Sequence, residues 1–247
     1  MATRLVHVVA DATDPQRQAD FWSKVFGWQT KTLDSAVMVL PGGWRYPDPG
    51  PLPLLFEPAS EPKTGRNRLH FDLPTKSAAF KEDLVKRILG LGATPADIGQ
   101  GDVPWDVLAD PEGNEFCVLD PRPGIYFDTG PIAAVVANSA DPDAVAPVWA
   151  EATGWRRSKS ASRDGLVAMR APHVRGPFVE LLRVAGAELG GGRIRLDVAP
   201  TLEDDFDESV AGLLAAGAKP ADGGQPDAPW VVLADAEDAE FRVLTPR

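Results

Sequence analysis

The sequence contains the same pattern twice. Residues 104–122 read PWDVLADPEGNEFCVLDPR and residues 229–247 read PWVVLADAEDAEFRVLTPR, and the two segments are identical at 13 of 19 positions with a constant offset of 125 residues. Residues 14–28 and 141–155 share a second pattern, Asp-Pro, Trp and Gly-Trp, at an offset of 127. A period of this length is typical of two duplicated domains and excludes the short units of a solenoid.

The duplication predicts the domain boundaries. We expect one domain at residues 1–122 and a second at 131–247, joined by a linker at 123–130 that carries the Pro and Gly residues of a connector. With 247 residues, of which 44% are hydrophobic, the chain can bury two ordinary cores.

The composition limits the classes of binding partner and the cellular compartment that we expect for this protein. Cys117 is the single cysteine, which excludes a disulfide framework and favours a reducing compartment. The net charge of −11, without a basic stripe, argues against nucleic acid and anionic membranes as partners. No apolar run reaches the length of a membrane span, and residues 1–14 lack the apolar segment of a signal peptide. We therefore expect a cytoplasmic protein that binds a small molecule, as a monomer or a homodimer.

Each half shows the same order of secondary structure. In the first half, a β-branched apolar run predicts a strand, and Asp14-Pro15 then marks the start of a helix that ends near Gly27. A second helix is expected at residues 76–89. The strands are expected at residues 4–10, 29–33, 36–40, 52–57, 69–73, 94–98, 105–109 and 115–119. The order is βαβββ, twice per half and four times in the chain, which predicts an α+β fold.

Three segments identify a family resemblance. They are HVVADATDPQRQADFWSKVFGW at residues 7–28, NRLHFDLP at 67–74 and WDVLADPEGNEFCVLDP at 105–121. With the βαβββ order, these motifs resemble the vicinal oxygen chelate (VOC) superfamily, in its glyoxalase-like branch. The resemblance implies tandem glyoxalase-like domains built from four βαβββ modules, whose curled mixed β-sheets surround clefts that often hold a divalent metal.

The resemblance also implies metal ligands on the first and last strands of the modules of the first half. Strand periodicity agrees, because His70 alternates with the apolar Leu69 and Phe71 and so points away from the core. Two imidazoles with one or two carboxylates suit Zn, Ni, Mn or Fe. The residues at the implied ligand positions are His7, His70, Glu115 and, as a fourth ligand, Glu57.

The second half lacks both histidines. Its residues at the same four positions, in the order of His7, His70, Glu57 and Glu115, are Ala134, Arg195, Glu180 and Glu240. We expect Arg195 to lie between Glu180 and Glu240, because a guanidinium can satisfy two carboxylates at once. The second domain is therefore predicted to be free of metal.

Five residues are candidates for acting on a substrate. Glu57 and Glu115 are the candidate catalytic carboxylates, because a glutamate at or beside the metal can take up a proton. Trp44 and Tyr46 lie in an extended loop of the first half that either walls the ligand pocket or is an ordered surface loop. Cys117 shares a strand face with Glu115, and we expect it to line the pocket rather than to act as a nucleophile.

Two functions from different classes remain open. The resemblance implies a divalent-metal-dependent enzyme that acts on a small oxygen-rich substrate, with lyase- or isomerase-type chemistry through a metal-chelated enediolate or oxyanion, or with dioxygenase chemistry. The alternative is a non-enzymatic protein that binds a small molecule or an antibiotic, as bleomycin-resistance proteins do. The seven Trp residues and the acidic charge are compatible with the alternative, whereas the histidine pair favours the enzyme.

Overall fold

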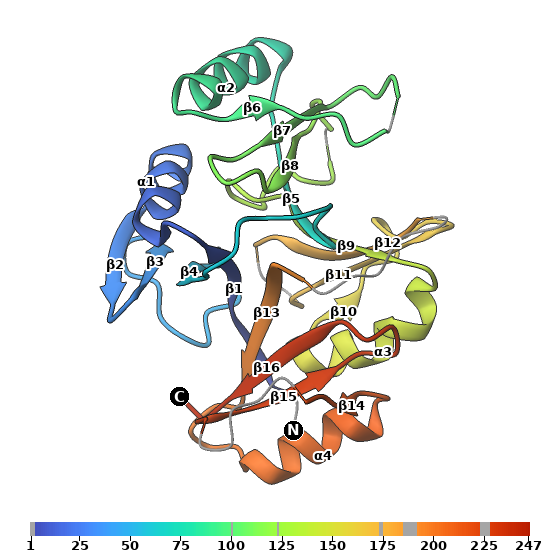
Figure 1. Ribbon diagram of the computed structural model, residues 1–247. Coiled ribbons are helices and arrows are strands. Elements are labelled where there is room, and N and C mark those ends of the chain that lie inside the picture. The colour runs from blue at the N-terminus through green and yellow to red at the C-terminus, as the bar shows by residue number, and fades with distance from the viewer. Residues whose placement is uncertain (1–2, 100, 123, 173–174, 185–191, 223–227) are drawn as a thin grey trace.

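The chain folds into four βαβββ modules, as the sequence predicts (Figure 1). The computed structural model describes residues 3–99, 101–122, 124–172, 175–184, 192–222 and 228–247. Within these residues, no helix is long and apolar enough to cross a lipid bilayer. The mixture of helices with strands in both directions confirms the α+β class.

The modules follow one another along the chain. The first contains β1 (Arg4–Ala12), α1 (Pro15–Phe26), β2 (Gln29–Leu33), β3 (Ala36–Leu40) and β4 (Leu54–Pro58). The second contains β5 (Leu69–Leu73), α2 (Ala78–Gly90), β6 (Thr94–Pro95), β7 (Asp106–Ala109) and β8 (Glu115–Val118). The third contains β9 (Ala134–Ser139), α3 (Pro142–Thr153), β10 (Arg156–Arg157), β11 (Leu166–Arg170) and β12 (Phe178–Arg183). The fourth contains β13 (Ile194–Ala199), α4 (Phe206–Ala215), β14 (Lys219–Pro220), β15 (Trp230–Ala234) and β16 (Glu240–Leu244).

The ends of the first helix in each half follow from the sequence. The side chain of Asp14 accepts a hydrogen bond from the backbone N–H of Arg17 at 3.0 Å, which caps α1. Gly27 ends α1 with a φ of +69°, and Gly154 ends α3 with a φ of +68°. This left-handed conformation favours glycine, so the repeated Gly-Trp pair marks a helix end in both halves.

Each of the two eight-stranded sheets combines one module from each half. We call them sheet A, with the strand order β14-β15-β16-β13-β1-β4-β3-β2, and sheet B, with the order β10-β11-β12-β9-β5-β8-β7-β6. In sheet A, β1 pairs antiparallel with β13, and in sheet B β5 pairs antiparallel with β9. The two modules of one half therefore lie in different sheets, and each sheet is completed by the other half.

The first helix of each half joins the two sheets. Trp22 of α1 packs edge-on against Phe71 and Phe116 of sheet B, with ring centroids 5.4 and 5.0 Å apart. Trp149 of α3 packs against Phe241 of sheet A, with ring centroids 5.2 Å apart and ring planes tilted by 49°. One continuous hydrophobic core results, and it covers one face of each sheet. Polar side chains and two smaller hydrophobic clusters lie outside this core.

Candidate functional site

Two clusters of polar side chains lie on the sheet faces away from the core. The sheet-A face carries His7, Glu57, Arg195, Asp197 and Arg242. The sheet-B face carries His70, Asp72, Cys117 and Glu180.

The four predicted metal ligands are divided between the two sheets. His7 and Glu57 belong to sheet A, whereas His70 and Glu115 belong to sheet B. The expected grouping inside the first half is therefore corrected. The four residues are separated because each sheet combines modules from both halves. β1 and β4 therefore lie in one sheet, and β5 and β8 in the other.

The sheet-A face is an ion network with its own cations. Arg242 donates to Glu57 Oε1 at 2.8 Å and to Asp197 Oδ2 at 2.6 Å. Arg195 donates to the other oxygen of Glu57 and, at 2.8 Å, to Asp11. His7 Nε2 lies 2.9 Å from Asp197 Oδ2. Burial alone would raise the pKa of Asp197, but the hydrogen bonds from His7 and Arg242 hold this pKa below its ordinary value.

This network does not fit a metal ion. Both carboxylate oxygens of Glu57 are already held by guanidinium groups. An arginine cannot give up its charge, so Arg195 and Arg242 would repel a divalent cation at this place. A cavity of about 580 Å³ lies beside the network, lined in part by Arg195, Trp230 and Arg242.

The expected partners of Arg195 are also corrected. Arg195 does not lie between Glu180 and Glu240, because β12 with Glu180 is in sheet B while β16 with Glu240 is in sheet A. Its guanidinium instead bridges Glu57 and Asp11, both from the first half. The predicted chemistry, a guanidinium between two carboxylates, is present with different partners.

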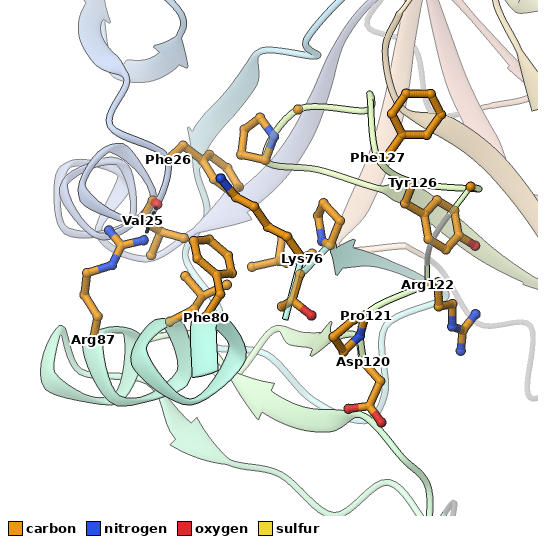
Figure 2. A pocket seen from close by; sticks show the side chains of 17 residues that line it. Val25, Phe26, Lys76, Phe80, Arg87, Asp120, Pro121, Arg122, Tyr126 and Phe127 are labelled. Atoms are coloured by element: carbon orange, nitrogen blue, oxygen red, sulfur yellow. Dashed lines mark hydrogen bonds between the residues drawn. The ribbon is translucent and has the colours of Figure 1, made fainter. Parts of the chain in front are cut away.

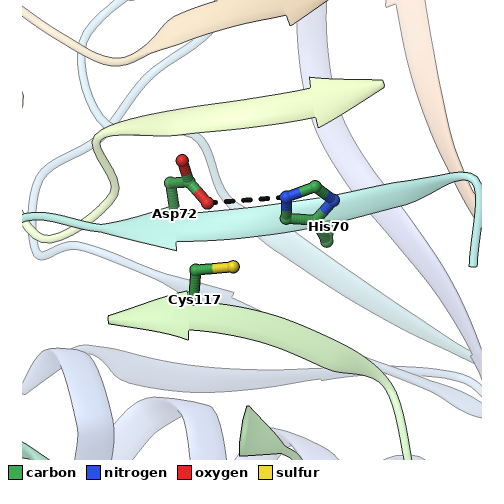
Figure 3. A group of neighbouring side chains, drawn as sticks. All are labelled: His70, Asp72 and Cys117. Atoms are coloured by element: carbon green, nitrogen blue, oxygen red, sulfur yellow. Dashed lines mark ion pairs between the residues drawn. The ribbon is translucent and has the colours of Figure 1, made fainter. Parts of the chain in front are cut away.

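The sheet-B face holds a group of three potential metal ligands. Figure 3 shows His70 and Asp72 on β5 and Cys117 on the neighbouring strand β8. One ligand atom from each of the three residues lies within 4.8 Å of the others, and this is the one such group found in the described residues. His70 Nε2 lies 3.5 Å from Asp72 Oδ1, yet this buried oxygen has no hydrogen-bond partner.

Glu180 is a buried carboxyl group on the same face. Burial, followed by repulsion from Asp72, raises the pKa of Glu180 to about 7. Its Oε1 accepts a hydrogen bond of 2.8 Å from the hydroxyl of Tyr126, which comes from the segment between the two halves. Burial and the carboxylate of Asp72 also raise the pKa of the Cys117 thiol. The sheet-B face thus concentrates acidic groups.

The strand register corrects one equivalence between the two halves, that of Glu57 with Glu180. Val9 and Val136 are equivalent residues of β1 and β9 at the offset of 127, and they pair with Leu55 and Glu180. Glu57 instead pairs with Asp11. Glu180 therefore stands at the position of Leu55, two residues away from the position of Glu57. A shift of two residues keeps the side chain on the same face of the sheet.

The duplication allows the two faces to be compared position by position. Asp72 and Asp197 are equivalent residues, 125 positions apart. Asp72 pairs with Cys117 on β8, the last strand of its module, and Asp197 pairs with Arg242 on β16, the last strand of its own. At the positions of His70 and Cys117, the sheet-A face carries Arg195 and Arg242. In the described part of the chain, no lysine or arginine forms an ion pair with Asp72 or Glu180. The sheet-B face therefore has buried acidic groups without the two permanent cations of the sheet-A face.

The remaining candidate residues lie outside this group. Glu115 accepts hydrogen bonds from Lys63 Nζ at 2.7 Å and from a backbone N–H at 3.3 Å. Trp44 donates to a carbonyl of its own loop at 3.3 Å. Tyr46 packs at the end of sheet A and donates to the carbonyl of Ala199 at 2.5 Å. The third histidine of the chain, His173, is outside the described residues.

Sequence reasoning missed three features of the sheet-B face. Asp72 is not among the ligands that the sequence predicts, and Tyr126 falls in the predicted linker. Glu180 was assigned to a different partner strand. A signal was present for Tyr126, because a buried tyrosine in a connector needs a polar partner for its hydroxyl. Only the pairing of β5 with β9 brings that partner, Glu180, into place.

Comparison with known proteins assigns the family. A family model described as a glyoxalase-like domain matches the chain twice, at residues 7–119 and 134–244. The chain belongs to the glyoxalase-like domain family. The double match confirms the tandem arrangement and the VOC resemblance. A comparison with curated protein sequences found no match.

Solved structures share the fold over nearly the whole chain. Glyoxalase I from Zea mays is 14% identical with a TM-score of 0.65, and the match covers 99% of this chain and 92% of that one. A putative dioxygenase from Bacillus subtilis is 15% identical with a TM-score of 0.60, covering 99% and 85%. At these identities the likeness concerns the fold and not the reaction.

Proposed function

We propose that the protein is a divalent-metal-dependent enzyme that acts on a small oxygen-rich substrate at the sheet-B face. The observation that carries this proposal is the contrast between the two faces. The sheet-A face neutralises its carboxylates with Arg195 and Arg242, whereas the sheet-B face has His70 and Cys117 at those positions. A bound cation would stabilise the buried acidic groups, with which no lysine or arginine of the described residues forms an ion pair.

The donor set is suited to a transition metal. His70 offers an imidazole nitrogen, Asp72 a carboxylate oxygen without a hydrogen-bond partner, and Cys117 a sulfur. Imidazole with thiolate favours Zn or Fe over the harder ions Mg and Ca. When bound, such an ion supplies Lewis-acid polarisation of a substrate oxygen. Glu115 is a weaker candidate than the sequence suggests, because Lys63 already neutralises it.

The other residues of the face support proton-transfer chemistry of the lyase or isomerase type. The carboxyl group of Glu180 can hold a proton at Oε1 or Oε2, and the Tyr126 hydroxyl fixes its orientation through the hydrogen bond of 2.8 Å. Phe178 packs against the Tyr126 ring, with centroids 5.8 Å apart, and shields this carboxyl group from water. Glu180 therefore takes the catalytic role that the sequence assigns to Glu57.

The proposal assigns the site to both halves. His70, Asp72 and Cys117 come from the domain proposed at residues 1–122, and Glu180 comes from the domain proposed at 131–247. Neither domain would then carry the complete site alone, and the proposed linker at 123–130 contributes Tyr126. A cytoplasmic location is retained as part of the proposal, since a free thiol at the site requires reducing conditions.

Metal analysis of matched variants tests the proposal. The full-length protein should bind one equivalent of Zn or Fe by elemental analysis. His70→Ala and Asp72→Asn should weaken binding by more than the ~10-fold that loss of an outer partner costs. His7→Ala is the matched control, because it removes the histidine of the sheet-A face. The proposal is wrong if no equivalent of metal binds, or if His7→Ala has the larger effect.

A metal-free binding protein is the second candidate, and it is supported by the cavity of the sheet-A face. This cavity, of about 580 Å³, has a size typical of small-molecule sites. The ring of Trp230 in its wall lies 5.1 Å from the Arg242 guanidinium. Saturable binding of an aromatic antibiotic such as bleomycin to the chelator-treated protein, lost on Trp230→Ala, would favour this function over the enzyme.

A further inference from the structure

A groove of about 690 Å³ lies beside the sheet-B face and borders it at Tyr126. It is bounded by α1, by α2, by the end of β5 and by the segment between the two halves (Figure 2). Its walls are mainly apolar and include Phe26, Phe80, Leu84 and Phe127. Phe80 is 38% exposed and Phe127 is 78% exposed. Large aromatic side chains gathered and exposed at one groove are characteristic of a binding surface.

The second half provides an internal control for this groove, because there the equivalent helices are in contact. A Cβ atom added to Gly212 of α4 would lie 3.2 Å from Glu151 Oε1 of α3. A Cβ atom at Gly217, just after α4, would lie 3.8 Å from Val148. At Gly92, the equivalent of Gly217, an added Cβ atom would meet nothing within 4 Å. The fold itself therefore does not require a gap between the two helices.

The side chains of α2 that face the groove are larger than the equivalent side chains of α4, which explains why the gap between α1 and α2 is open. The equivalents of Gly212 and Ser209 at the offset of 125 are Arg87 and Leu84. Arg87 spans from α2 to α1 and donates to the carbonyls of Lys24 at 2.9 Å and Val25 at 3.1 Å. The long Arg87 side chain thus occupies the place of Gly212 and links the two helices. The groove is thus a property of this half of the chain and not of the module.

Three cations line the groove, Lys76, Arg87 and Arg122, and none of them forms an ion pair with a carboxylate of the described residues. Arg87 is bound to backbone carbonyls of α1 and Arg122 lies over the Trp105 ring, so Lys76 is the cation beside the exposed aromatic rings. Figure 2 shows the Lys76 side chain extending into the groove. Its Nζ lies 5.2 Å from the centroid of the Phe80 ring, and no carboxylate of the described residues forms an ion pair with it. The carboxylate of Asp120 at the rim is already bound by Lys81, at 2.5 Å. An unpaired ammonium group beside aromatic rings is complementary to an aromatic anion.

We propose that this groove binds a small aromatic monocarboxylate, with the ring system between Phe26, Phe80 and Phe127 and the carboxylate on Lys76 Nζ. The volume lies within the range of small-molecule sites. The affinity comes from burial of aromatic surface, and the preference for an anion comes from Lys76. The groove adjoins the sheet-B face at Tyr126, but the proposed ligand contacts involve none of the three potential metal ligands there.

Calorimetric titration of the full-length protein with 2-naphthoate tests the proposal. We expect saturable 1:1 binding, and no comparable binding of the cation 2-naphthylmethylammonium. Lys76→Glu should weaken naphthoate binding at least about 10-fold, equivalent to about 1.4 kcal/mol. Lys31→Glu makes the same charge change on the exposed strand β2 and should leave the affinity unchanged.

Two further variants separate the possible outcomes. Leu84→Trp should fill the groove and abolish binding, and Lys76→Glu remains informative if Leu84→Trp fails to fold. His70→Ala should bind naphthoate normally, so that failure of the metal site does not affect this result. The inference is overturned if naphthoate does not bind, or if Lys76→Glu and Lys31→Glu weaken it equally.

Discussion

Replacing the buried carboxyl group of Glu180 with the amide of glutamine should stabilise the metal-free protein. Burial and Asp72 raise the pKa of this carboxyl group from 4.5 to about 7. In the unfolded chain the same group titrates near its ordinary value. The folded protein therefore holds a proton at Glu180 that the unfolded chain has already released between these two pH values. Stability falls as the pH rises through this window and remains reduced above it.

The magnitude follows from the size of the pKa difference. At about 1.4 kcal/mol per pKa unit, ionised Glu180 reduces the free energy of unfolding by about 3 kcal/mol at pH 8 and by nothing below pH 4. Glutamine has the same shape and cannot ionise, and its amide oxygen can still accept the hydrogen bond from Tyr126. Glu180→Gln should thus raise the free energy of unfolding at pH 8 by up to about 3 kcal/mol and leave it nearly unchanged at pH 4.

Urea unfolding of the chelator-treated protein at pH 4, 6 and 8 measures this difference. Comparing variant with parent at each pH cancels the titration of all other groups. Glu57→Gln is the control on the sheet-A face, and it should destabilise the protein by about 2 kcal/mol because two guanidinium groups lose a charged acceptor. The reasoning is refuted if Glu180→Gln destabilises the protein at pH 8, or if its effect does not depend on pH.

Three other outcomes follow from the same contacts. Arg195→Ala should lower the free energy of unfolding by about 3 kcal/mol, because Glu57 and Asp11 lose their bridge, and it should leave the metal content unchanged. Tyr126→Phe should raise the pKa of Glu180 further, because it removes the hydrogen bond that favours the charged form. NMR titration of the Glu180 carboxyl carbon would detect this rise, and an unchanged pKa would contradict the prediction. Addition of Zn to the parent protein should abolish the loss of stability above pH 7 but should have no such effect on His70→Ala.

Local structure was predictable from the sequence because its signals are local. The strands at residues 29–33, 36–40 and 69–73 begin and end where apolar and β-branched patterns indicate. Asp14-Pro15 and Gly27 mark the start and the end of α1, because capping and a left-handed helix end depend on neighbouring residues alone. The family resemblance extended these local predictions to four modules and to the α+β class.

The site was less predictable because it depends on which strands are neighbours. The face on which His70 and Cys117 lie follows from strand alternation, but the strand opposite β5 does not. That strand is β9 of the other half, which places Val136 beside His70 and Glu180 one strand further, on β12. In the same way, the repeat shows only that Arg242 stands at the position of Cys117. Its role becomes visible when Glu57 and Asp197 meet around it.

The exchange of modules also explains why the predicted ligands looked like one site. In sheet A, β1 pairs with β13, and β13 is the equivalent of β5. Two copies of the isolated first half, residues 1–122, would each expose the edges of β1 and β5. Pairing β1 of one copy with β5 of the other would reproduce the sheet of the full chain. His7 and Glu57 of one copy would then share a face with His70 and Cys117 of the other.

The isolated first half should therefore form a symmetric dimer in which His7 becomes a metal ligand. Two equivalent faces would form, each with two histidines and without Arg195 and Arg242. Sedimentation of residues 1–122 should give a dimer, and metal titration should show that His7→Ala weakens binding in the half although it does not in the full chain. A folded monomer would mean that the two modules of one half can pair with each other. A dimer whose metal binding does not depend on His7 would mean that the strands pair in another register.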